Sequence, residues 1–213
     1  TVVQNVNGRY TSMVLGGQEK VLFGSGFIED ALCGCRFRIS ARSFYQVNPV
    51  QSRRLYETAI EYAALTGRET VLDAYCGTGT IGLIAARDAA QVLGVELNRD
   101  AVRDAAANAR RNHIENARFL CGDAGEVMQR LAAEGQPVDV VLMDPPRAGA
   151  SLPFLDSLLH LAPRRVIYVS CDPQTQRRDL LYLGGRYRLE KAQPVDMFPH
   201  TGHIETVALL TRK

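Results

Sequence analysis

From residue 69 onward, short apolar runs alternate with segments whose apolar residues recur every three to four positions. The runs are typical of strands buried on both faces, and the periodic segments are typical of amphipathic helices. The predicted strands are 70–75, 91–97, 117–121, 138–144, 165–170, 187–197 and 205–212. The helices predicted between them are 80–89, 99–112, 124–134, 152–162 and 175–183. This alternation predicts an α/β fold with a doubly wound, Rossmann-like, mostly parallel sheet.

The first 45 residues follow a different pattern. They are rich in β-forming residues, and three glycine-containing turns typical of hairpins interrupt them: Asn7-Gly8, Gly16-Gly17 and Gly24-Ser25-Gly26. We therefore expect a small antiparallel β region at 1–45 and a second domain at 46–213. Asn48 and Pro49 predict the start of a helix over 48–65, as an N-cap and a first helical residue.

Composition narrows the function classes only slightly. The chain has 213 residues, of which 46% are hydrophobic, and a net charge of +2, which permits nucleic-acid binding without favouring it. Its five cysteines form no C-x-x-C pair, so we expect no metal. No apolar run approaches the length of ~18 residues that a membrane span needs, and no signal-peptide pattern is present. We expect a cytoplasmic protein with no membrane partner.

A glycine motif follows the strand predicted at 70–75. Gly77, Gly79 and Gly82 spell G-x-G-x-x-G, and Glu96 ends the next strand, where a carboxylate accepts hydrogen bonds from ribose hydroxyls. The motif suits a dinucleotide or S-adenosylmethionine (SAM), and glycines with a purely structural role would look the same. Asp73 favours SAM, because an acid there suits an ammonium group better than a pyrophosphate. Asp123, after the third strand, is placed to accept from an adenine amino group.

The fourth predicted strand ends in Asp144-Pro145-Pro146-Arg147. The prolines fix the backbone, so Asp144 is expected to project over cofactor and substrate. Enzymes that methylate amino groups usually carry an aromatic residue where this chain has Arg147. The sequence therefore argues against an exocyclic nitrogen as the methyl acceptor.

Cys171 directly follows the fifth strand, on the same rim as Asp144. A thiolate beside a SAM site suits methylation at uracil C5, because addition to C6 makes C5 nucleophilic. A base must then remove the C5 proton. Glu205, which opens the last strand in apolar surroundings, is the candidate, and His200 and His203 are alternative bases or RNA contacts.

Six stretches together resemble the RNA uracil-C5 methyltransferase family: SFYQVN (43–48), DAYCGTGTIGL (73–83), GVELN (94–98), MDPPRAG (143–149), YVSCDP (168–173) and DMFPHTGHIE (196–205). The resemblance implies SAM-dependent formation of 5-methyluridine, with Cys171 as nucleophile and Glu205 as proton acceptor. The cofactor-site residues expected from the motifs and the resemblance are Gln46, Tyr75, Gly77, Gly79, Thr80, Glu96, Asp123 and Asp144. Asp172 departs from the asparagine often found in the family, and a carboxylate there would oppose thiolate formation.

Family members usually carry an N-terminal β-barrel RNA-binding domain and, in many, a four-cysteine iron–sulfur site. We expect this chain to be the catalytic portion of a longer protein, with 1–45 as the tail of a central domain. The FPHTGH stretch is similar to the branch that acts on 23S ribosomal RNA. We expect an RNA partner and a monomer. Candidate phosphate contacts are Arg36, Arg38, Arg42, Arg53, Arg54, Arg177 and Arg178.

Three alternatives stay open at this point. The first is methylation of uridine C5 in transfer RNA. The second is methylation of cytosine C5 in RNA, although those enzymes typically place a second cysteine where this chain has Arg147. The third is a non-catalytic RNA-binding module with a relic SAM pocket, against which the intact set of cysteine, glutamate and cofactor-site acids counts.

Overall fold

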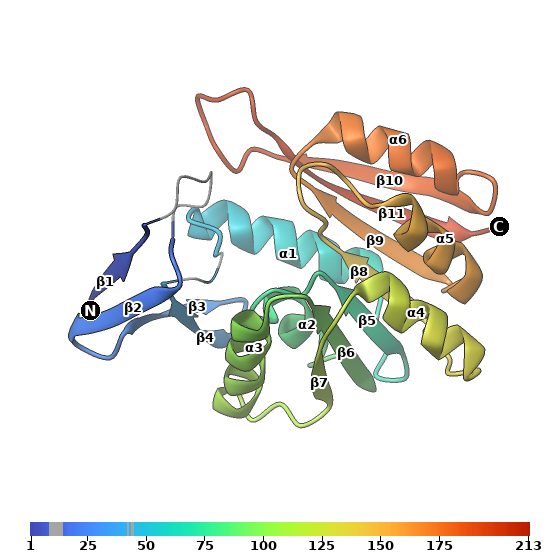
Figure 1. Ribbon diagram of the computed structural model, residues 1–213. Helices are drawn as coiled ribbons and strands as arrows, with labels where there is room; N and C mark the ends of the chain where they lie inside the picture. Colours follow the sequence, from blue (N-terminus) through green and yellow to red (C-terminus); the bar gives the residue numbers. More distant parts are fainter. Residues whose placement is uncertain (9–14, 42, 44) are drawn as a thin grey trace.

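The computed structural model describes residues 1–8, 15–41, 43 and 45–213. Within these residues, one seven-stranded sheet forms the centre of the molecule (Figure 1). Its strands, in spatial order, are β10 (Tyr187–Val195), β11 (Glu205–Arg212), β9 (Arg165–Ser170), β8 (Val140–Met143), β5 (Thr70–Ala74), β6 (Gln91–Glu96) and β7 (Ala117–Cys121). Strands β5 to β9 run parallel to one another, and β10 and β11 are antiparallel at one edge. This confirms the doubly wound, mostly parallel sheet.

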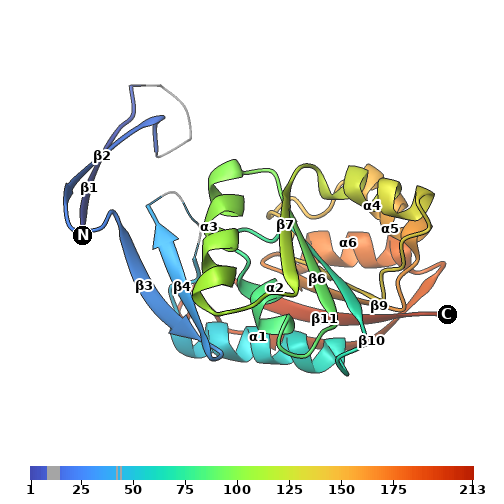
Figure 2. The same ribbon diagram turned by 90° about the horizontal axis from the view of Figure 1, so that it is seen from below.

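Helices cover both faces of this sheet. They are α1 (Pro49–Ala63), α2 (Thr80–Ala85), α3 (Arg99–Arg111), α4 (Ala124–Ala133), α5 (Leu152–Leu161) and α6 (Pro173–Leu183). Figure 2 shows α1 on the opposite side of the sheet from α4, α5 and α6. The chain order reverses on either side of β5, so the carboxyl ends of β5 and β8 form a topological switch point, where ligands bind in such folds.

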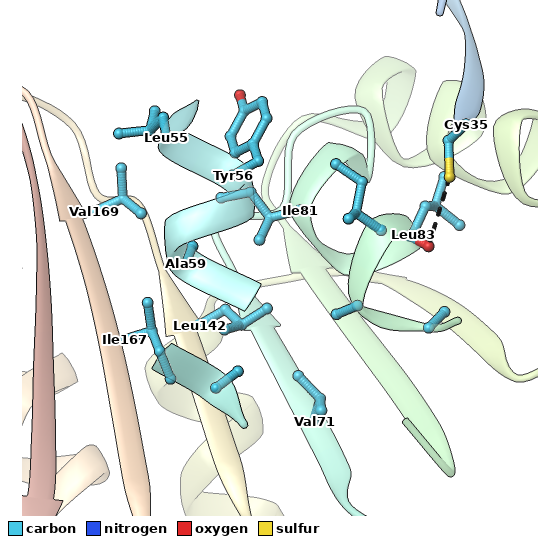
Figure 3. Close-up of a cluster of buried hydrophobic side chains, with 14 of the residues drawn as sticks. Cys35, Leu55, Tyr56, Ala59, Val71, Ile81, Leu83, Leu142, Ile167 and Val169 are labelled. Atoms are coloured by element: carbon cyan, nitrogen blue, oxygen red, sulfur yellow. Dashed lines mark hydrogen bonds between the residues drawn. The ribbon is translucent and has the colours of Figure 1, made fainter. Parts of the chain in front are cut away.

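The two faces of the sheet divide the core into two clusters, because successive strand residues point to opposite sides. Val71 and Leu142 pack with Leu55 of α1 in the cluster shown in Figure 3. Their neighbours Leu72 and Met143 belong to the other cluster, which includes residues of α4, α5 and α6. Burial on both faces explains why these strands are mostly apolar rather than alternating.

Helix ends follow their capping residues. The Asn48 side chain accepts from the Gln51 amide before α1, which begins at Pro49 as expected. Helix α2 ends at Ala85, earlier than the 80–89 that the pattern predicts. The chain turns there to enter β6, and the amides of Ala90 and Gln91 donate to the Glu69 carbonyl instead of to the preceding helical turn.

The predicted antiparallel β region is present as two separate sheets. Strand β1 (Val2–Val6) pairs with β2 (Gln18–Phe23), and β3 (Phe27–Leu32) pairs with β4 (Cys35–Ser40). The expectation of a hairpin at Gly24-Ser25-Gly26 is wrong, because that turn joins β2 to β3, which belong to different sheets. The tight hairpin turn is Cys33-Gly34, whose φ angles of 49° and 78° suit a two-residue loop.

The two hairpins differ in how they meet the rest of the chain. Strand β4 packs on α3, where Asn108 and Asn112 bond to its backbone, and Phe37 is fully buried in the core. Strand β2 is exposed along its whole length, and Figures 1 and 2 both show the β1–β2 hairpin standing away from the seven-stranded sheet. The boundary between residues 45 and 46 stays a prediction.

Across the described residues, none of the helices has the length and apolar character that a membrane span requires. All five cysteines carry free thiols, and Cys35 lies buried with its Sγ near the Leu83 carbonyl (Figure 3).

Candidate active site

A cleft opens at the carboxyl ends of β5, β6 and β8, at the switch point of the sheet. Six of the residues expected in the cofactor site line it: Gln46, Tyr75, Gly77, Thr80, Glu96 and Asp144. These residues come from four separate stretches of sequence, and three of the four stretches meet because parallel strand ends share one rim of the sheet. The fold therefore brings most of the expected site together.

Gly79 and Asp123 are not among the described residues that line the cleft. Gly79 begins α2 with a φ of 82°, and a Cβ on it would lie 2.9 Å from the Phe119 ring. Asp123 is the N-cap of α4, where its side chain accepts from the Glu126 amide. The structure thus gives both residues a local structural function, and their expected roles toward a cofactor stay predictions.

Glu96 is held by backbone donors at the end of β6. Its Oε2 accepts from the Gly77 amide at 3.1 Å, and its Oε1 accepts from the Asn98 amide at 2.8 Å. A carboxylate has about four acceptor positions. Since Glu96 lines the cleft, its remaining positions are available to hydroxyl donors of a ligand.

Asp73 explains the third glycine of the motif. Its buried Oδ2 accepts from the Gly82 amide at 2.9 Å, and a Cβ on Gly82 would lie 2.6 Å from that oxygen. Burial raises the pKa of Asp73 to about 7, although the Gly82 hydrogen bond opposes the rise. Only glycine at position 82 allows the helix to approach this carboxyl.

The cleft holds three acids, and none of the described residues that line it carries a positive charge. Asp73, Glu96 and Asp144 all line it. The pKa of Asp144 rises to about 8, chiefly because of burial and then because of Glu205 and Asp73. SAM carries a sulfonium and an ammonium group, whereas the pyrophosphate of a dinucleotide would be repelled here. The charge of the cleft therefore selects SAM from the cofactors that the motif permits.

An unpaired polar atom supports the same fit. The buried Oε1 of Gln46 has no hydrogen-bond partner among the residues that the structure describes, and the Gln46 side chain is at the cleft wall. A buried acceptor without a partner is costly, so it marks a position where a ligand donor is expected. The residues present thus suit SAM in both charge and hydrogen-bonding capacity.

Cys171 and Glu205 lie near each other at one end of the sheet, where β9 ends and β11 begins. Strands β9 and β11 pair antiparallel, with Thr206 opposite Ser170 as the last pair of the ladder. Continuing this register by one residue brings Glu205 opposite Cys171, and residues opposite each other point to the same face. Cys171 is partly buried, and Glu205 is 3% exposed.

The two groups share an electrostatic environment with Asp144 and Arg147. Burial raises the pKa of Cys171, Glu205 and Asp144 raise it further, and Arg147 lowers it. Burial also raises the pKa of Glu205, against the opposing effect of Arg147. A carboxylate with a raised pKa is a better proton acceptor than an exposed glutamate.

The sequence predicts that the Asp172 carboxylate opposes formation of the Cys171 thiolate. Asp172 is not among the main influences on the pKa of Cys171. Asp172 caps α6, where its Oδ1 accepts from the amides of Gln174 and Thr175. Burial is the largest cause of the raised pKa of Cys171, and the charges of Glu205 and Asp144 come next.

Arg147 and His203 contact each other at the mouth of the site, through the Arg147 Nη2 and the His203 Nδ1. The position of Arg147 near Cys171 and Glu205 was not expected from its place after the prolines. No group of three or more histidine, cysteine or acidic side chains suitable for a metal occurs in the part of the chain that the structure describes. His200 and His203 therefore form no metal site there.

Some expected arginine contacts have structural partners instead. Arg178 donates to the carbonyls of Ala148 and Ala150 and pairs with the buried Asp179. The Arg38 guanidinium lies over the Phe27 ring at 4.1 Å. Arg42 lies outside the described residues.

Sequence reasoning missed Tyr56, a buried residue of α1 that lines the cleft. Its apolar ring and its place beside Leu55 on the inward face of a helix are typical of core residues. No signal in the helical periodicity distinguishes a tyrosine that packs from one that also borders a cleft.

Known proteins show the same combination of fold and motifs. A sequence profile of the family described as tRNA (Uracil-5-)-methyltransferase matches residues 16–213. An uncharacterized RNA methyltransferase of Staphylococcus aureus (strain MRSA252) is 48% identical over 213 residues, and one of Halalkalibacterium halodurans is 50% identical over 214 residues. Each alignment covers 100% of this chain and 47% of the relative, so the chain spans about half the length of these relatives.

Solved structures of methyltransferases are similar to this chain as well. The Pyrococcus abyssi tRNA (uracil-54, C5)-methyltransferase, in complex with S-adenosyl-L-homocysteine, is similar with a TM-score of 0.81 and 32% identity, over 97% of this chain and 50% of that one. A putative SAM-dependent methyltransferase from Streptococcus mutans shares the fold, with a TM-score of 0.71 at 13% identity over 91% of this chain and 58% of that one. The profile match and the identity of the relatives place the chain in the tRNA (uracil-5-)-methyltransferase family, whose members are SAM-dependent RNA methyltransferases.

Proposed function

We propose that the protein methylates C5 of uridine in RNA through a covalent adduct between Cys171 and C6 of the base. The observation that carries this proposal is the β9–β11 register, which, continued by one residue, brings a thiol opposite a buried carboxyl near the acidic cleft. A cysteine alone or a glutamate alone would fit many functions. The pair at this position fits a reaction that needs a nucleophile first and a base afterwards.

The chemistry divides between the two side chains. The Cys171 thiolate adds to C6, and the electrons of the C5–C6 double bond move toward C5 and the O4 carbonyl. SAM, when bound, supplies an electrophilic methyl group to C5. The Glu205 carboxylate then takes the C5 proton, the C5–H electrons restore the double bond, and the bond from C6 to sulfur breaks to return the thiolate. Each bond made to the enzyme is thereby broken again.

Residues of the cleft also influence the nucleophile. Asp144 raises the pKa of Cys171, and Arg147 lowers it. A cation bound beside Asp144 offsets the charge that opposes the thiolate. We infer that Cys171 ionises more readily after the cofactor is bound than before.

The decisive experiment replaces Glu205 by glutamine in the full-length protein. The substitution keeps shape and removes basicity, so addition and methyl transfer proceed while elimination stalls. We expect a covalent enzyme–RNA complex that survives denaturing gels, needs no fluorinated base and carries label from methyl-labelled SAM. If Glu205→Gln turns over like the unmodified enzyme, the proton acceptor is another group, with His203 the first to examine.

Within RNA, we propose ribosomal RNA as the substrate, because the FPHTGH stretch (198–203) is similar to the branch acting on 23S ribosomal RNA. Transfer RNA is the second candidate, since the Pyrococcus abyssi structure is of a tRNA (uracil-54, C5)-methyltransferase. Incubating the full-length protein with each RNA and mapping 5-methyluridine separates them. Methylation of transfer RNA alone would overturn the ribosomal assignment and leave the chemistry intact.

Two other functions make different predictions. An RNA cytosine-C5 methyltransferase would be trapped by RNA containing 5-fluorocytidine, whereas the proposed enzyme is trapped only by RNA containing 5-fluorouridine. A non-catalytic RNA-binding module would show no heat of SAM binding by calorimetry while remaining folded. The acidic cleft with its unpaired Gln46 oxygen favours binding.

A further inference from the structure

Gln176 is a buried polar residue of α6 that joins two strands of the sheet. Its side chain is 4% exposed, its Nε2 donates to the Tyr168 carbonyl of β9 at 3.0 Å, and its Oε1 accepts from the Thr206 Oγ1 of β11 at 2.6 Å. Tyr168 lies three residues before Cys171, and Thr206 directly follows Glu205. One side chain therefore connects the strand that carries the thiol to the strand that carries the carboxyl.

The bridge lies where the backbone ladder stops. Thr206 and Ser170 form the last pair of β11 with β9, and both Glu205 and Cys171 lie one residue beyond it. Backbone pairing therefore does not by itself fix their separation. The Gln176–Thr206 hydrogen bond, together with a longer contact of Thr206 Oγ1 to the Ser170 carbonyl at 3.4 Å, holds the strand ends at this point.

Packing alone does not account for a glutamine here. Gln176 is buried on a helix whose other inward residues include the apolar Leu183. An amide taken out of water is costly unless its hydrogen bonds are made, and here both ends of the amide make one. A leucine would fill the same space without desolvating an amide, so the polar bridge is the feature that glutamine adds.

The rest of α6 is fixed to the remaining elements of the site. Thr175 Oγ1 donates to the Arg147 carbonyl at 3.2 Å. The buried Asp179 accepts from the Tyr168 hydroxyl at 2.7 Å and from the Ala150 amide at 2.8 Å. Helix α6 thus contacts β9 and the segment after β8 through other residues, and Gln176 extends this attachment to β11.

We propose that Gln176 is a positioning residue that sets the Glu205 carboxyl relative to Cys171, and hence relative to the C5 proton of a uracil bound to Cys171. Gln176 is not among the described residues that line the cleft, and it acts through Thr206. The inference rests on the proposed function for its catalytic consequence, but the spacing of the two side chains is measurable without any substrate.

The first test uses Gln176→Met in the full-length protein, because methionine keeps the length and the apolar packing but makes neither hydrogen bond. We expect kcat to fall roughly 10- to 100-fold through misplacement of the base. The affinity for SAM should stay within about twofold of the unmodified protein, whereas the KM for RNA should fall together with kcat, because a step after adduct formation is the one that slows. Covalent enzyme–RNA complex should accumulate during turnover, because only the elimination step is slowed.

Variants of Thr206 provide the rescue. Thr206→Val removes the hydroxyl at nearly constant shape and should reproduce the Gln176→Met behaviour. Thr206→Ser keeps the hydroxyl and should restore turnover. The matched control is Gln129→Met, which breaks a comparable bond from a glutamine amide to the Ser157 hydroxyl between α4 and α5 and should leave kcat unchanged.

The second test measures the spacing directly and needs no RNA. The pH profile of Cys171 alkylation, followed by mass spectrometry of its peptide, reports the charges that face the thiol: Glu205 from β11, and Asp144 and Arg147 from the segment after β8. Glu205→Gln should shift this profile to lower pH in the unmodified protein. The shift should be smaller in a Gln176→Met background if Gln176 holds the two groups together.

The outcomes are distinguishable. An equal alkylation shift in both backgrounds overturns the positioning role, and so does a Gln176→Met enzyme with unchanged kcat. A fall in melting temperature without any change in adduct level or alkylation shift would make Gln176 a packing residue only. If the unmodified protein methylates no uridine, the proposed function fails, while the alkylation experiment still decides whether Gln176 sets the spacing.

Discussion

The cofactor cleft and the Cys171–Glu205 pair lie at the same rim of the sheet but are held in place by different means. In the cleft, backbone amides fix Glu96 and Asp73, and glycines allow the close approach. At the pair, the strands are antiparallel, the ladder ends one residue short, and buried side chains of α6 complete the connection. The cleft is therefore sensitive to changes in backbone and volume, whereas the pair is sensitive to changes in side-chain chemistry.

The largest expected effect comes from a substitution that should remove catalysis at the Cys171–Glu205 pair and leave the cofactor cleft unchanged. Cys171→Ala should abolish both the covalent adduct and methyl transfer, because the proposed mechanism assigns the attack on C6 to this thiol. SAM affinity, measured by calorimetry, should be unchanged, since Cys171 is not among the residues that line the cleft in the described structure. The exposed Cys121 gives the control, and Cys121→Ala should retain full activity. An adduct formed by the Cys171→Ala enzyme would require a different nucleophilic thiol.

Glu96→Ala should affect the cleft alone. Loss of charge-assisted hydrogen bonds to a ligand should weaken SAM binding by about 1.5–3 kcal/mol, or roughly 10- to 100-fold. Alkylation of Cys171 should proceed as before, because Glu96 is not among the main influences on that thiol. Glu134→Ala, at the exposed end of α4, is the control. Unchanged SAM affinity would contradict the assignment of Glu96 to the cofactor.

A methyl group added at Gly82 should disturb the cleft because it would occupy space that the Asp73 carboxyl needs. The Cβ would lie 2.6 Å from Asp73 Oδ2, so the carboxyl or the helix must move. Gly82→Ala should lower the free energy of unfolding by about 1–3 kcal/mol, as overpacking does, and also weaken SAM binding. Gly122→Ala, where nothing lies within 4 Å of the new Cβ, should change neither quantity. Equal denaturation midpoints for the two variants would show that the contact with Asp73 relaxes without cost.

The smallest expected effect is a dependence on pH. The pKa values of Asp73 and Asp144 are raised to about 7 and about 8, so both acids gain charge as pH rises from 6 to 8. Affinity for the cationic SAM should therefore rise several-fold over this range, and affinity for uncharged-sulfur S-adenosylhomocysteine should rise less. Asp144→Asn should flatten the SAM profile. A profile that falls with pH would contradict the charge argument.

The same two acids affect the stability of the ligand-free protein in the opposite direction. Because their pKa values are higher in the folded state than in the unfolded chain, the folded state binds more protons between those values. Their contribution to the free energy of unfolding is present at low pH and is lost as pH rises toward 8. Urea titrations of the unmodified protein and of Asp144→Asn at several pH values should show a weaker pH dependence for the variant.

Sequence patterns predict the sheet well, because burial on both faces makes β5, β8 and β9 mostly apolar rather than alternating. They also place Cys171, Glu205 and Asp144 at strand ends, where the fold concentrates chemistry. Gln46 has no such pattern, and only the resemblance to a known family identified it. The sequence could not show whether Asp123 caps a helix or binds a ligand. An aspartate suits both a helix N-cap and an acceptor for an adenine amino group.

Other features depend on contacts that a sequence does not display. The Cys33-Gly34 turn was missed because cysteine is not a usual residue for a positive φ. The bridge from Gln176 to Thr206 joins positions 30 residues apart, and nothing in the periodicity of α6 marks that glutamine. The influence of Glu205 and Asp144 on Cys171 follows from strand order, which alternating elements leave undetermined.

The place of β11 also has a consequence for how the chain folds during synthesis. Strand β11 lies between β9 and β10 although it follows both in the sequence. While β11 is still unmade, β9 presents an unpaired edge, and the finished β10 is the nearest strand able to occupy it. Direct pairing of β10 with β9 would exclude β11 and leave Cys171 without Glu205 beside it. Correct folding therefore requires the β9 edge to stay free until β11 has been made, so the order of synthesis exposes this edge to incorrect pairing.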